Sequence, residues 1–592
     1  SLHDALPISV TLGSAASLAG VANVVAGDGA VRLVQSSGNA SALTLRGGAG
    51  DDTFVVGTGA QLASDVVSGG SGANALLIAS AGSIDDTSFA KVTGVQALSL
   101  TSVSDVTLGS NAAKAGILTV YGGIASDSIT QDAKSSAKIA VIGGGANDFI
   151  GLGSVKQLAA DTVIGSGGTD TLAVLSAGAI VDASFANIAG VEALSLTGAS
   201  TVTLDGSAGA AGFTTIYGGD GLTKISHTSG DARSLTIVGG SGTDLVTVAD
   251  GQVLANDSIV AGSGGAGTLA VASDAALADG SFAKVQNIGV LSLTGASAVT
   301  LGSAAVAAQI TTVIGGAGDS TFTQSASAAF QITAGRGNDL ISLSDVAYLA
   351  DDTLTGGTGV NTLALSGSAE ISDDAFTNHK GLQVLALDGD SSVTLEAAAQ
   401  KAGIVSVIGG AGDLTVTQTS ANSAALTLVG GSGDGNFSVA TAAQLGKDSI
   451  VGGAGSNTLS ISADATLADK SFAKVAGVQA LSLTGSSTVI LGAASSAAEF
   501  ATIFGGDGTT AITQTADNTN SLTIVGGDGT DLITLAKGEY LAADSIVGGS
   551  GDIATIVVAA GATLEDDAFA QIQNVGVLKL TGSSDLALDA RS

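Results

Sequence analysis

Aspartates recur at one fixed position of a glycine-rich turn, and their carboxylates are candidate ligands for a cation. Seven turns have aspartate at the sixth position: Asp52, Asp127, Asp148, Asp170, Asp244, Asp339 and Asp531. Carboxylates at recurrent spacing suit Ca²⁺, which takes about six to eight oxygen ligands. Asp127, Asp148 and Asp170 follow one another at nearly equal spacing, one in each of three successive turns. They are the best candidates for a calcium ladder.

A second aspartate recurs once in every copy of a repeated segment that reads LASD, LAAD, LAND, LADD or LGKD. The six residues are Asp65, Asp161, Asp257, Asp352, Asp448 and Asp544. Aspartate in a turn also bonds its own backbone, and this capping role is the favoured interpretation. Metal binding by these six residues is the alternative.

The residue pattern does not indicate a catalytic site. His227 and His379 are the histidines outside the first eight residues, and they do not share a position in the repeat. No nucleophile has a base near it in sequence, and the Lys and Arg residues are too scattered for a polysaccharide lyase. We therefore predict that the chain is not an enzyme.

Composition narrows the class of protein. The 592 residues have a formal net charge of −33, include 88 glycines and contain no Cys, Met or Trp. Without cysteine, disulfides, thiol catalysis and Cys-ligated zinc are excluded. The acidity disfavours nucleic acid as a partner and favours cations. No apolar run is long enough to predict a membrane span.

The first eight residues differ in character from the rest. Residues 1–8 read S-L-H-D-A-L-P-I and contain the only proline of the chain. They resemble the translation of a sequencing-library adapter, and Arg591-Ser592 fits the reverse complement of its end. We exclude residues 1–8 from fold reasoning. We expect the natural protein to continue beyond both ends.

A repeat of about 96 residues fills residues 9–592. Its clearest marker is a phenylalanine in the context SFA or AFA, found at Phe89, Phe185, Phe282, Phe376, Phe472 and Phe569. Six copies of the repeat are present. No linker or shift of composition divides them, so one continuous domain is predicted.

Each copy alternates short apolar runs with glycine turns. The runs have three to five residues, are rich in Val, Ile, Leu and Thr, and partly alternate as strands do. Four turns in each copy predict coils of about 24 residues, hence about 24 coils. Because one coil cannot bury its apolar face alone, stacked coils must form the core. The fold class predicted is all-β, a parallel β-solenoid. Alanine-rich pieces from Asn111, Gly206, Glu396 and Ser495 are expected as single helical turns or loops.

The turns resemble the nonapeptide G-G-x-G-x-D-x-U-x of RTX (repeats-in-toxin) proteins, where U is a large apolar residue. Residues 47–55, 239–247 and 526–534 match it in full. The resemblance implies parallel β-rolls that bind Ca²⁺ through glycine-region carbonyls and the sixth-position aspartate. It also implies a secreted bacterial surface protein, of the S-layer or giant adhesin type, exported by type I secretion. Here the nine-residue motif is not in uninterrupted tandem, so only a few calcium sites are expected.

The function predicted is therefore a non-enzymatic, extracellular structural protein, partly stabilised by Ca²⁺. Self-assembly or cell-surface polysaccharide are its expected partners. Two alternatives stay open. A glycan- or ice-binding solenoid would present a regular threonine ladder, but the pair Thr201 and Thr203 is not kept in the other copies. An autotransporter passenger would need no metal.

Overall fold

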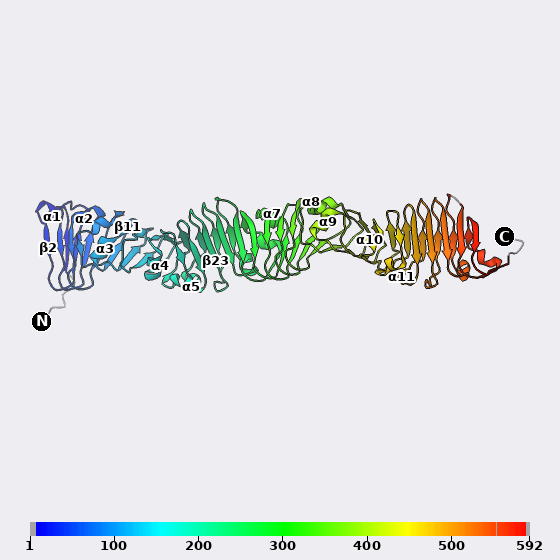
Figure 1. Cartoon of the computed structure of the whole chain (residues 1–592). Helices are drawn as coiled ribbons and strands as arrows, with labels where there is room; N and C mark the ends of the chain where they lie inside the picture. Colours follow the sequence, from blue (N-terminus) through cyan, green and yellow to red (C-terminus); the bar gives the residue numbers. More distant parts are fainter. Residues whose placement is uncertain (1–7, 552, 588–592) are drawn as a thin grey trace. The chain divides into compact units, whose positions relative to one another are not determined.

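Parallel β-strands stacked coil upon coil build the described part of the chain, residues 8–551 and 553–587 of a computed structural model (Figure 1). Typical neighbours are β10 (Ala97–Leu100) and β12 (Thr119–Gly123), which pair in parallel. The predicted all-β parallel solenoid is thereby confirmed. Of the adapter-like segment, residues 1–7 lie outside the described residues, as does Arg591-Ser592.

The chain divides into two compact units. The first comprises residues 1–294 and 307–310, and the second comprises residues 295–306 and 311–592. The prediction of one continuous solenoid concerns how these units join, and it stays a prediction. Each unit is described by itself below.

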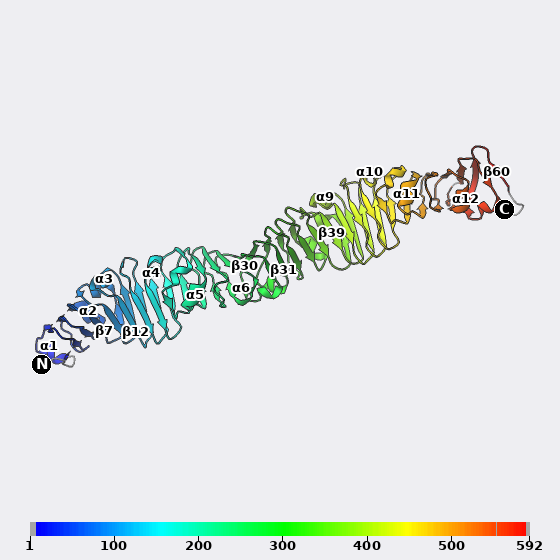
Figure 2. The same ribbon diagram turned by 90° about the horizontal axis from the view of Figure 1, so that it is seen from below.

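Two long sheets dominate the first unit, and Figure 2 shows their strands side by side. One has the order β1 (Ile8–Leu12), β3 (Val31–Gln35), β5 (Thr53–Val56), β7 (Ala75–Ile78), β10, β12, β14 (Ala140–Gly144), β16 (Thr162–Ser166) and β19 (Ile188–Ala189). The other has the order β8 (Gly82–Ile84), β11 (Ser104–Leu108), β13 (Ser128–Gln131), β15 (Phe149–Leu152), β17 (Thr171–Val174), β20 (Ala193–Leu196), β22 (Thr215–Tyr217), β24 (Thr236–Val238), β26 (Ser258–Val260) and β29 (Val285–Gln286).

The second unit is built in the same way. Its ten-stranded sheet has the order β38 (Ala369–Ile371), β40 (Ser391–Leu395), β42 (Leu414–Gln418), β44 (Gly435–Val439), β46 (Thr458–Ile461), β49 (Ala480–Leu483), β51 (Thr502–Phe504), β53 (Thr523–Val525), β55 (Ser545–Val547) and β58 (Ile572–Gln573). A six-stranded sheet contains β47 (Thr466–Leu467), β50 (Ser487–Leu491), β52 (Thr510–Gln514), β54 (Asp531–Leu535), β56 (Ala554–Val558) and β59 (Val575–Leu580).

Most coils are shorter than the length predicted from four turns in each repeat. Ala97 stacks on Thr119 and Thr119 stacks on Ala140, so one coil separates each pair. Four coils of this length do not use up a whole repeat, and each repeat therefore runs on into a fifth coil. Consequently β1 and β11, which are equivalent segments of successive repeats, belong to different sheets of the first unit. The predicted count of four coils per repeat is therefore too low.

Short helices account for further residues of each repeat. They are α1 (Ser14–Leu18), α2 (Gly59–Ser64), α3 (Ser110–Ala115), α4 (Val155–Ala160), α5 (Gly206–Ala211), α6 (Gly251–Asn256), α7 (Ser303–Ala307), α8 (Ala347–Asp351), α9 (Ala397–Ala402), α10 (Ala442–Leu445), α11 (Ala493–Ala497) and α12 (Glu539–Ala543). The alanine-rich pieces become α3, α5, α9 and α11, as expected. The helices that precede Asp65 and its five equivalents are not among the elements predicted from the sequence. These six residues are called the LAxD aspartates below, although the segment that ends at Asp448 reads LGKD. The signal for these helices was a capping box, as in Thr58 and Ser154, whose hydroxyls accept the N–H three residues on.

The core lies between the sheets and consists of alternate strand residues. In β11 the burial alternates, with Val106 and Leu108 inward and Asp105 outward. Of the repeat markers, Phe89, Phe185, Phe282, Phe376 and Phe472 are at most 1% exposed. Phe185 packs edge-on against Phe213, with ring centroids 5.1 Å apart. Aliphatic side chains thus fill most of the interior, together with buried phenylalanines such as Phe54, Phe213 and Phe500 besides the repeat markers.

Candidate functional site

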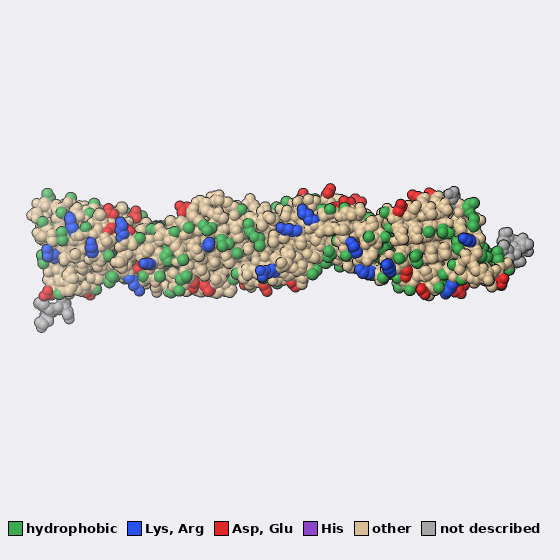
Figure 3. All heavy atoms as spheres, viewed as in Figure 1, with side chains coloured by type: hydrophobic (Ala, Val, Ile, Leu, Met, Phe, Trp, Pro, Cys, Tyr) green, Lys and Arg blue, Asp and Glu red, His purple; other side chains and the backbone are tan. Residues whose placement is uncertain are grey.

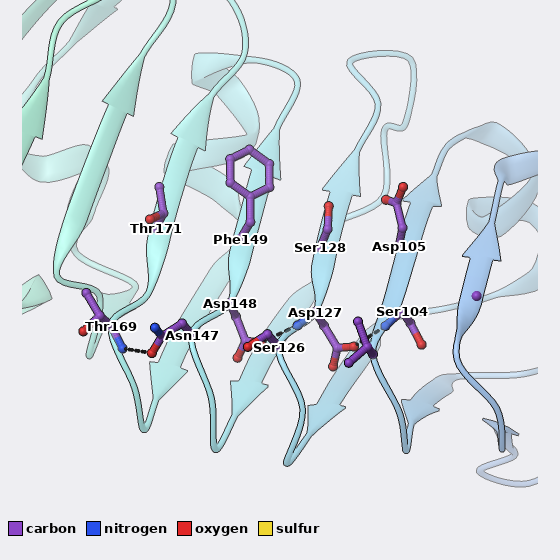
Figure 4. A pocket seen from close by; sticks show the side chains of 12 residues that line it. Ser104, Asp105, Ser126, Asp127, Ser128, Asn147, Asp148, Phe149, Thr169 and Thr171 are labelled. Carbon is purple, nitrogen blue, oxygen red and sulfur yellow. Dashed lines mark hydrogen bonds between the residues drawn. The ribbon is translucent and has the colours of Figure 1, made fainter.

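The seven sixth-position aspartates point inward, with exposed fractions between 0% and 3%. They lie beneath the glycine turns, at the ends of the alternating strand pattern. Figure 4 shows Asp127 and Asp148 in this position, between the turns and the strands. A buried carboxylate needs hydrogen-bond donors or a counter-charge, because its desolvation is unfavourable.

Each of these aspartates in the second repeat accepts a backbone N–H from the preceding coil. The Oδ1 atom of Asp127 accepts from Ser104 N, that of Asp148 from Asp127 N, and that of Asp170 from Asp148 N, all at 2.8 Å. The side chains therefore form a continuous row that joins coil to coil. We call this row the carboxylate ladder.

Glu192 extends the carboxylate ladder by one coil. Its Oε2 accepts the backbone N–H of Asp170 at 2.8 Å. Reasoning from the sequence missed this residue because it does not belong to a glycine turn. The signal was internal, since other copies have glutamine at the equivalent position, as at Gln96, Gln383 and Gln479. Gln96 accepts the N–H of Asn74 in the same way.

The second carboxylate oxygen of the ladder has no donor. Among the described residues, Oδ2 of Asp127, Asp148 and Asp170 is buried without a hydrogen-bond partner. A Cβ placed on Gly143 would lie 2.5 Å from Asp148 Oδ2 and 2.7 Å from Gly165 O. Carboxylate and carbonyl oxygens thus converge on the space that this glycine leaves open. Two acceptors meet there with no hydrogen between them.

In other coils the sixth position holds asparagine, whose side chain both accepts a backbone N–H and donates to a glycine carbonyl. Asn74 accepts Asp52 N at Oδ1, and its Nδ2 donates to Gly94 O at 2.9 Å. Asn361 and Asn457 donate in the same way to Gly381 O and Gly477 O. The comparison identifies what the aspartate coils lack, which is one positive or hydrogen-donating group per coil.

The remaining sixth-position aspartates do not form such a row. Asp52 accepts Val31 N at one oxygen and Gly48 N at the other. Asp339 accepts Ser320 N, while in Asp244 and Asp531 the Oδ2 atom accepts Gly262 N and Gly549 N, respectively. Each of these last three has one oxygen without a partner among the described residues. The second repeat is therefore the place where such carboxylates follow one another.

Burial makes the aspartates of the carboxylate ladder harder to ionise. Burial raises the pKa of Asp127 to about 6, with a further contribution from the charge of Asp148. Burial also raises the pKa of Asp148 and Asp170. The ionised form is thus less favourable here than in water, and a cation or a proton would relieve it.

The donor chemistry of the ladder fits Ca²⁺. The groups that converge at each step are a carboxylate oxygen and a glycine carbonyl oxygen, both hard ligands. Asp127, Asp148 and Asp170 are the residues that would hold the ion, and the ion would supply the missing positive charge. The described residues nevertheless contain no group of three or more His, Cys, Asp or Glu side chains placed to hold one metal. Any ion would therefore depend on backbone carbonyls and water for most of its ligands.

The six LAxD aspartates have a structural role in the hydrogen-bonding of the coils. They are at most 1% exposed, and Oδ1 of each accepts a backbone N–H from 22 residues earlier, as in Leu43 N to Asp65 at 2.7 Å. The other acceptors are Asp161, Asp257, Asp352, Asp448 and Asp544. Burial raises the pKa of Asp161, Asp352, Asp448 and Asp544 to about 6.

His227 is the partner of one of these aspartates. It ends β23 (Thr223–His227), is 2% exposed, and its Nδ1 lies 2.7 Å from Asp257 Oδ2. Its Nε2 donates to Asp231 O at 2.9 Å. Five other copies have a buried glutamine at this position: Gln35, Gln131, Gln324, Gln418 and Gln514. His227 and His379 do not share a repeat position, as stated from the sequence, but the equivalence of His227 to these glutamines was not recognised there.

Another recurrent aspartate, three residues before each marker phenylalanine, was also not predicted from the sequence. Asp86 accepts the N–H groups of Gly109, Asn111 and Ala112 at the start of α3. Asp182, Asp373 and Asp469 cap α5, α9 and α11 in the same way. Each caps a helix that begins in the next coil. Local capping rules do not reveal this role because the cap comes from a neighbouring coil.

A groove of about 560 Å³ lies over the carboxylate ladder. Asp127 and Asp148 form part of its floor, and its walls are side chains of β11, β13, β15 and β17 with the turns before them. Phe149 of β15 is 37% exposed at its centre.

Comparison with protein-family models and with curated proteins finds no match to this chain. Within the described residues, no helix is long and apolar enough to cross a membrane.

Proposed function

We propose that this chain is a non-enzymatic structural repeat protein of the bacterial cell surface, of the S-layer or adhesin-stalk type. The observation that supports it is the repetition of the same coil-to-coil hydrogen bonds through both units. Leu43 N to Asp65 in the first unit and Leu522 N to Asp544 in the second are equivalent bonds at 2.7 and 2.8 Å. Such a chain gains stability from each added coil.

Location outside the cell rests on composition and on the RTX-like turns. The absence of cysteine makes the chain insensitive to redox compartment. Export by type I secretion follows from the resemblance of the turns and forms part of the proposal. Self-assembly and cell-surface polysaccharide are the proposed partners.

Calcium is proposed to stabilise the second repeat. Asp127, Asp148 and Asp170 have unpaired buried oxygens, and the net charge of −33 favours cations. An ion that binds only the folded coils would stabilise them by mass action and favour folding after export.

Circular dichroism of the full chain, with a thermal melt in EGTA and then in millimolar Ca²⁺, tests the proposal. We expect a β-sheet signal in both buffers and a higher melting temperature with Ca²⁺. Mg²⁺ at equal ionic strength is the control for screening, because it prefers a smaller octahedral shell. An identical melt in all three buffers would remove calcium from the proposal and leave a metal-independent structural protein.

A further inference from the structure

Phe149 is an aromatic ring that the fold leaves partly in water. It is 37% exposed, and Figure 4 shows its ring standing away from β15, between Ser128 and Thr171 of the neighbouring strands. The equivalent positions in other repeats hold Thr53, Leu245 and Leu340. Tyr121, Tyr217 and Phe504 are also exposed, so what distinguishes Phe149 is its place in the groove, where it offers an apolar surface to a ligand.

Polar groups flank the ring on both sides of the groove. Ser126, Ser128, Thr169 and Thr171 supply hydroxyls, which both donate and accept. Asn147 is held in place because its Oδ1 accepts Thr169 N at 2.8 Å. An apolar platform with hydroxyl and amide groups around it matches a sugar ring, which has apolar C–H faces and hydroxyl edges.

The charged side chains that line the groove indicate which class of polysaccharide fits it. No Lys or Arg lines it, whereas the exposed carboxylate of Asp105 does. An acidic polysaccharide or a nucleic acid would be repelled. On the face seen in Figure 3, uncharged surface separates scattered charged side chains. Among polysaccharides, an uncharged one therefore suits the groove better than an acidic one, since Asp105, Asp127 and Asp148 all line it.

A peptide is disfavoured by the strand pairing. Binding of a peptide as an added strand requires a free sheet edge. Strand β15 pairs with β13 on one side and with β17 on the other, so the groove offers no such edge. Its side-chain rows instead repeat at the strand spacing of about 4.8 Å, which allows successive sugar units to meet successive coils.

We infer that the groove over β11, β13, β15 and β17 binds an uncharged polysaccharide segment, with Phe149 as the stacking platform. Asn147 and the four hydroxyl side chains would hold the ring edges. The inference rests on the polysaccharide partner in the proposed function and adds the place and the ligand chemistry. It does not depend on calcium.

A tryptophan reporter tests this site directly. The chain contains no tryptophan, so Phe149→Trp in the full chain places the only indole in the groove. The probes are neutral hexasaccharides of glucose, mannose, galactose and N-acetylglucosamine, with polygalacturonate as the acidic comparison. We expect saturable quenching or a blue shift with at least one neutral probe and none with polygalacturonate. Leu340→Trp, at the equivalent position of the fourth repeat and outside this groove, is the matched control and should not respond.

Calorimetry of the same neutral probe with the native chain and with Phe149→Ala measures the contribution of the ring. We expect about tenfold weaker binding for Phe149→Ala, with an unchanged thermal melt. Three results would overturn the inference: no response to any neutral probe, an equal response of Leu340→Trp, or binding of an unrelated apolar peptide with greater affinity. Because circular dichroism is recorded on each sample, a folded, calcium-stabilised chain that binds no sugar would refute only the groove.

Discussion

The backbone N–H of Asp170 donates to Oε2 of Glu192 at 2.8 Å, so four carboxylates occupy consecutive coils in the second repeat. The first repeat has a different row at the equivalent positions, Asp52, Asn74 and Gln96. The two repeats share a backbone hydrogen-bond pattern but differ in charge. The second repeat therefore has more carboxylates in consecutive coils than the first.

Neutralising the end of the carboxylate ladder should stabilise the chain when no metal is present. The double substitution Asp170→Asn and Glu192→Gln gives the second repeat the row of the first. We expect the free energy of unfolding to rise by about 1–2 kcal/mol in EGTA at neutral pH, because a buried unpaired acceptor becomes a donor. Thermal melts followed by circular dichroism measure the change.

The reverse substitution in the fourth repeat is the matched control. Asn361→Asp with Gln383→Glu introduces two carboxylates where Asn361 now donates to Gly381 O. This variant should melt at a lower temperature than the native chain in EGTA. A shift of the same sign in both double variants would contradict the explanation by unpaired acceptors.

Mild acid should stabilise the chain. Burial raises the pKa of Asp352, Asp448 and Asp544 from 3.8 to about 6. The folded chain therefore holds more protons than the unfolded chain between these values, and stability falls as pH rises through about 6. We expect a higher melting temperature near pH 5 than near pH 7.5, in EGTA and at constant ionic strength.

At lower pH, protonation of the aspartates that cap helices opposes the stabilisation by mild acid. Partial burial alone would raise the pKa of Asp182 and Asp469, but the backbone N–H groups of α5 and α11 outweigh it and lower the pKa of both. Their contribution is lost as pH falls below 3.8 and through the folded-state pKa. A melting temperature that rises steadily from pH 5 to pH 8 would contradict the raised pKa of Asp352, Asp448 and Asp544.

His227 should add its own pH dependence to the third repeat. Burial disfavours its charge, but the hydrogen bond and the charge of Asp257, with Asp231, raise its pKa above 6.5. This contribution is complete below pH 6.5 and is lost as pH rises through the folded-state pKa. His227→Gln, the residue of the other copies, should lower the melting temperature at pH 6 and flatten its decline above pH 7. His379→Gln serves as the comparison, because burial lowers the pKa of His379.

The glycine at the start of a turn should not tolerate a side chain. In Gly143→Ala the new Cβ would meet Asp148 Oδ2 at 2.5 Å and Gly165 O at 2.7 Å. We expect a loss of about 1–3 kcal/mol in stability, since the turn must move. Gly280→Ala, where nothing lies within 4 Å of the new Cβ, should change the melt little. Equal melts for both variants would show that the turns are looser than described.

Removing a cap that crosses between coils should destabilise the helix it serves. Asp182→Ala leaves the N–H groups of Asp205, Ser207 and Ala208 without their acceptor. We expect a loss of about 1–2 kcal/mol, with faster hydrogen exchange at the start of α5. Asp274→Ala, at an exposed aspartate, is the control. If both variants exchange at the native rate, the cap contributes nothing measurable.

The amino-acid sequence was sufficient to predict the fold class and the positions of the repeats along the chain. Alternating runs such as Val106 to Leu108 and the recurrence of Phe89 once in every repeat specify strands, repeats and core residues, because burial follows a period of two along a strand. The same pattern located the sixth-position aspartates and Asp65 with its equivalents, but it missed the capping role of Asp86 and its equivalents. It did not settle the length of a coil, since the turns contain helices whose residues look like loop.

The contacts of those aspartates depend on how the coils stack in three dimensions. Asp148 meets Asp127 from 21 residues away, and His227 meets Asp257 from 30 residues away. These distances depend on how many residues each coil takes, which no local pattern states. Glu192 joins the carboxylate ladder for the same reason, because stacking brings together side chains that are distant in sequence.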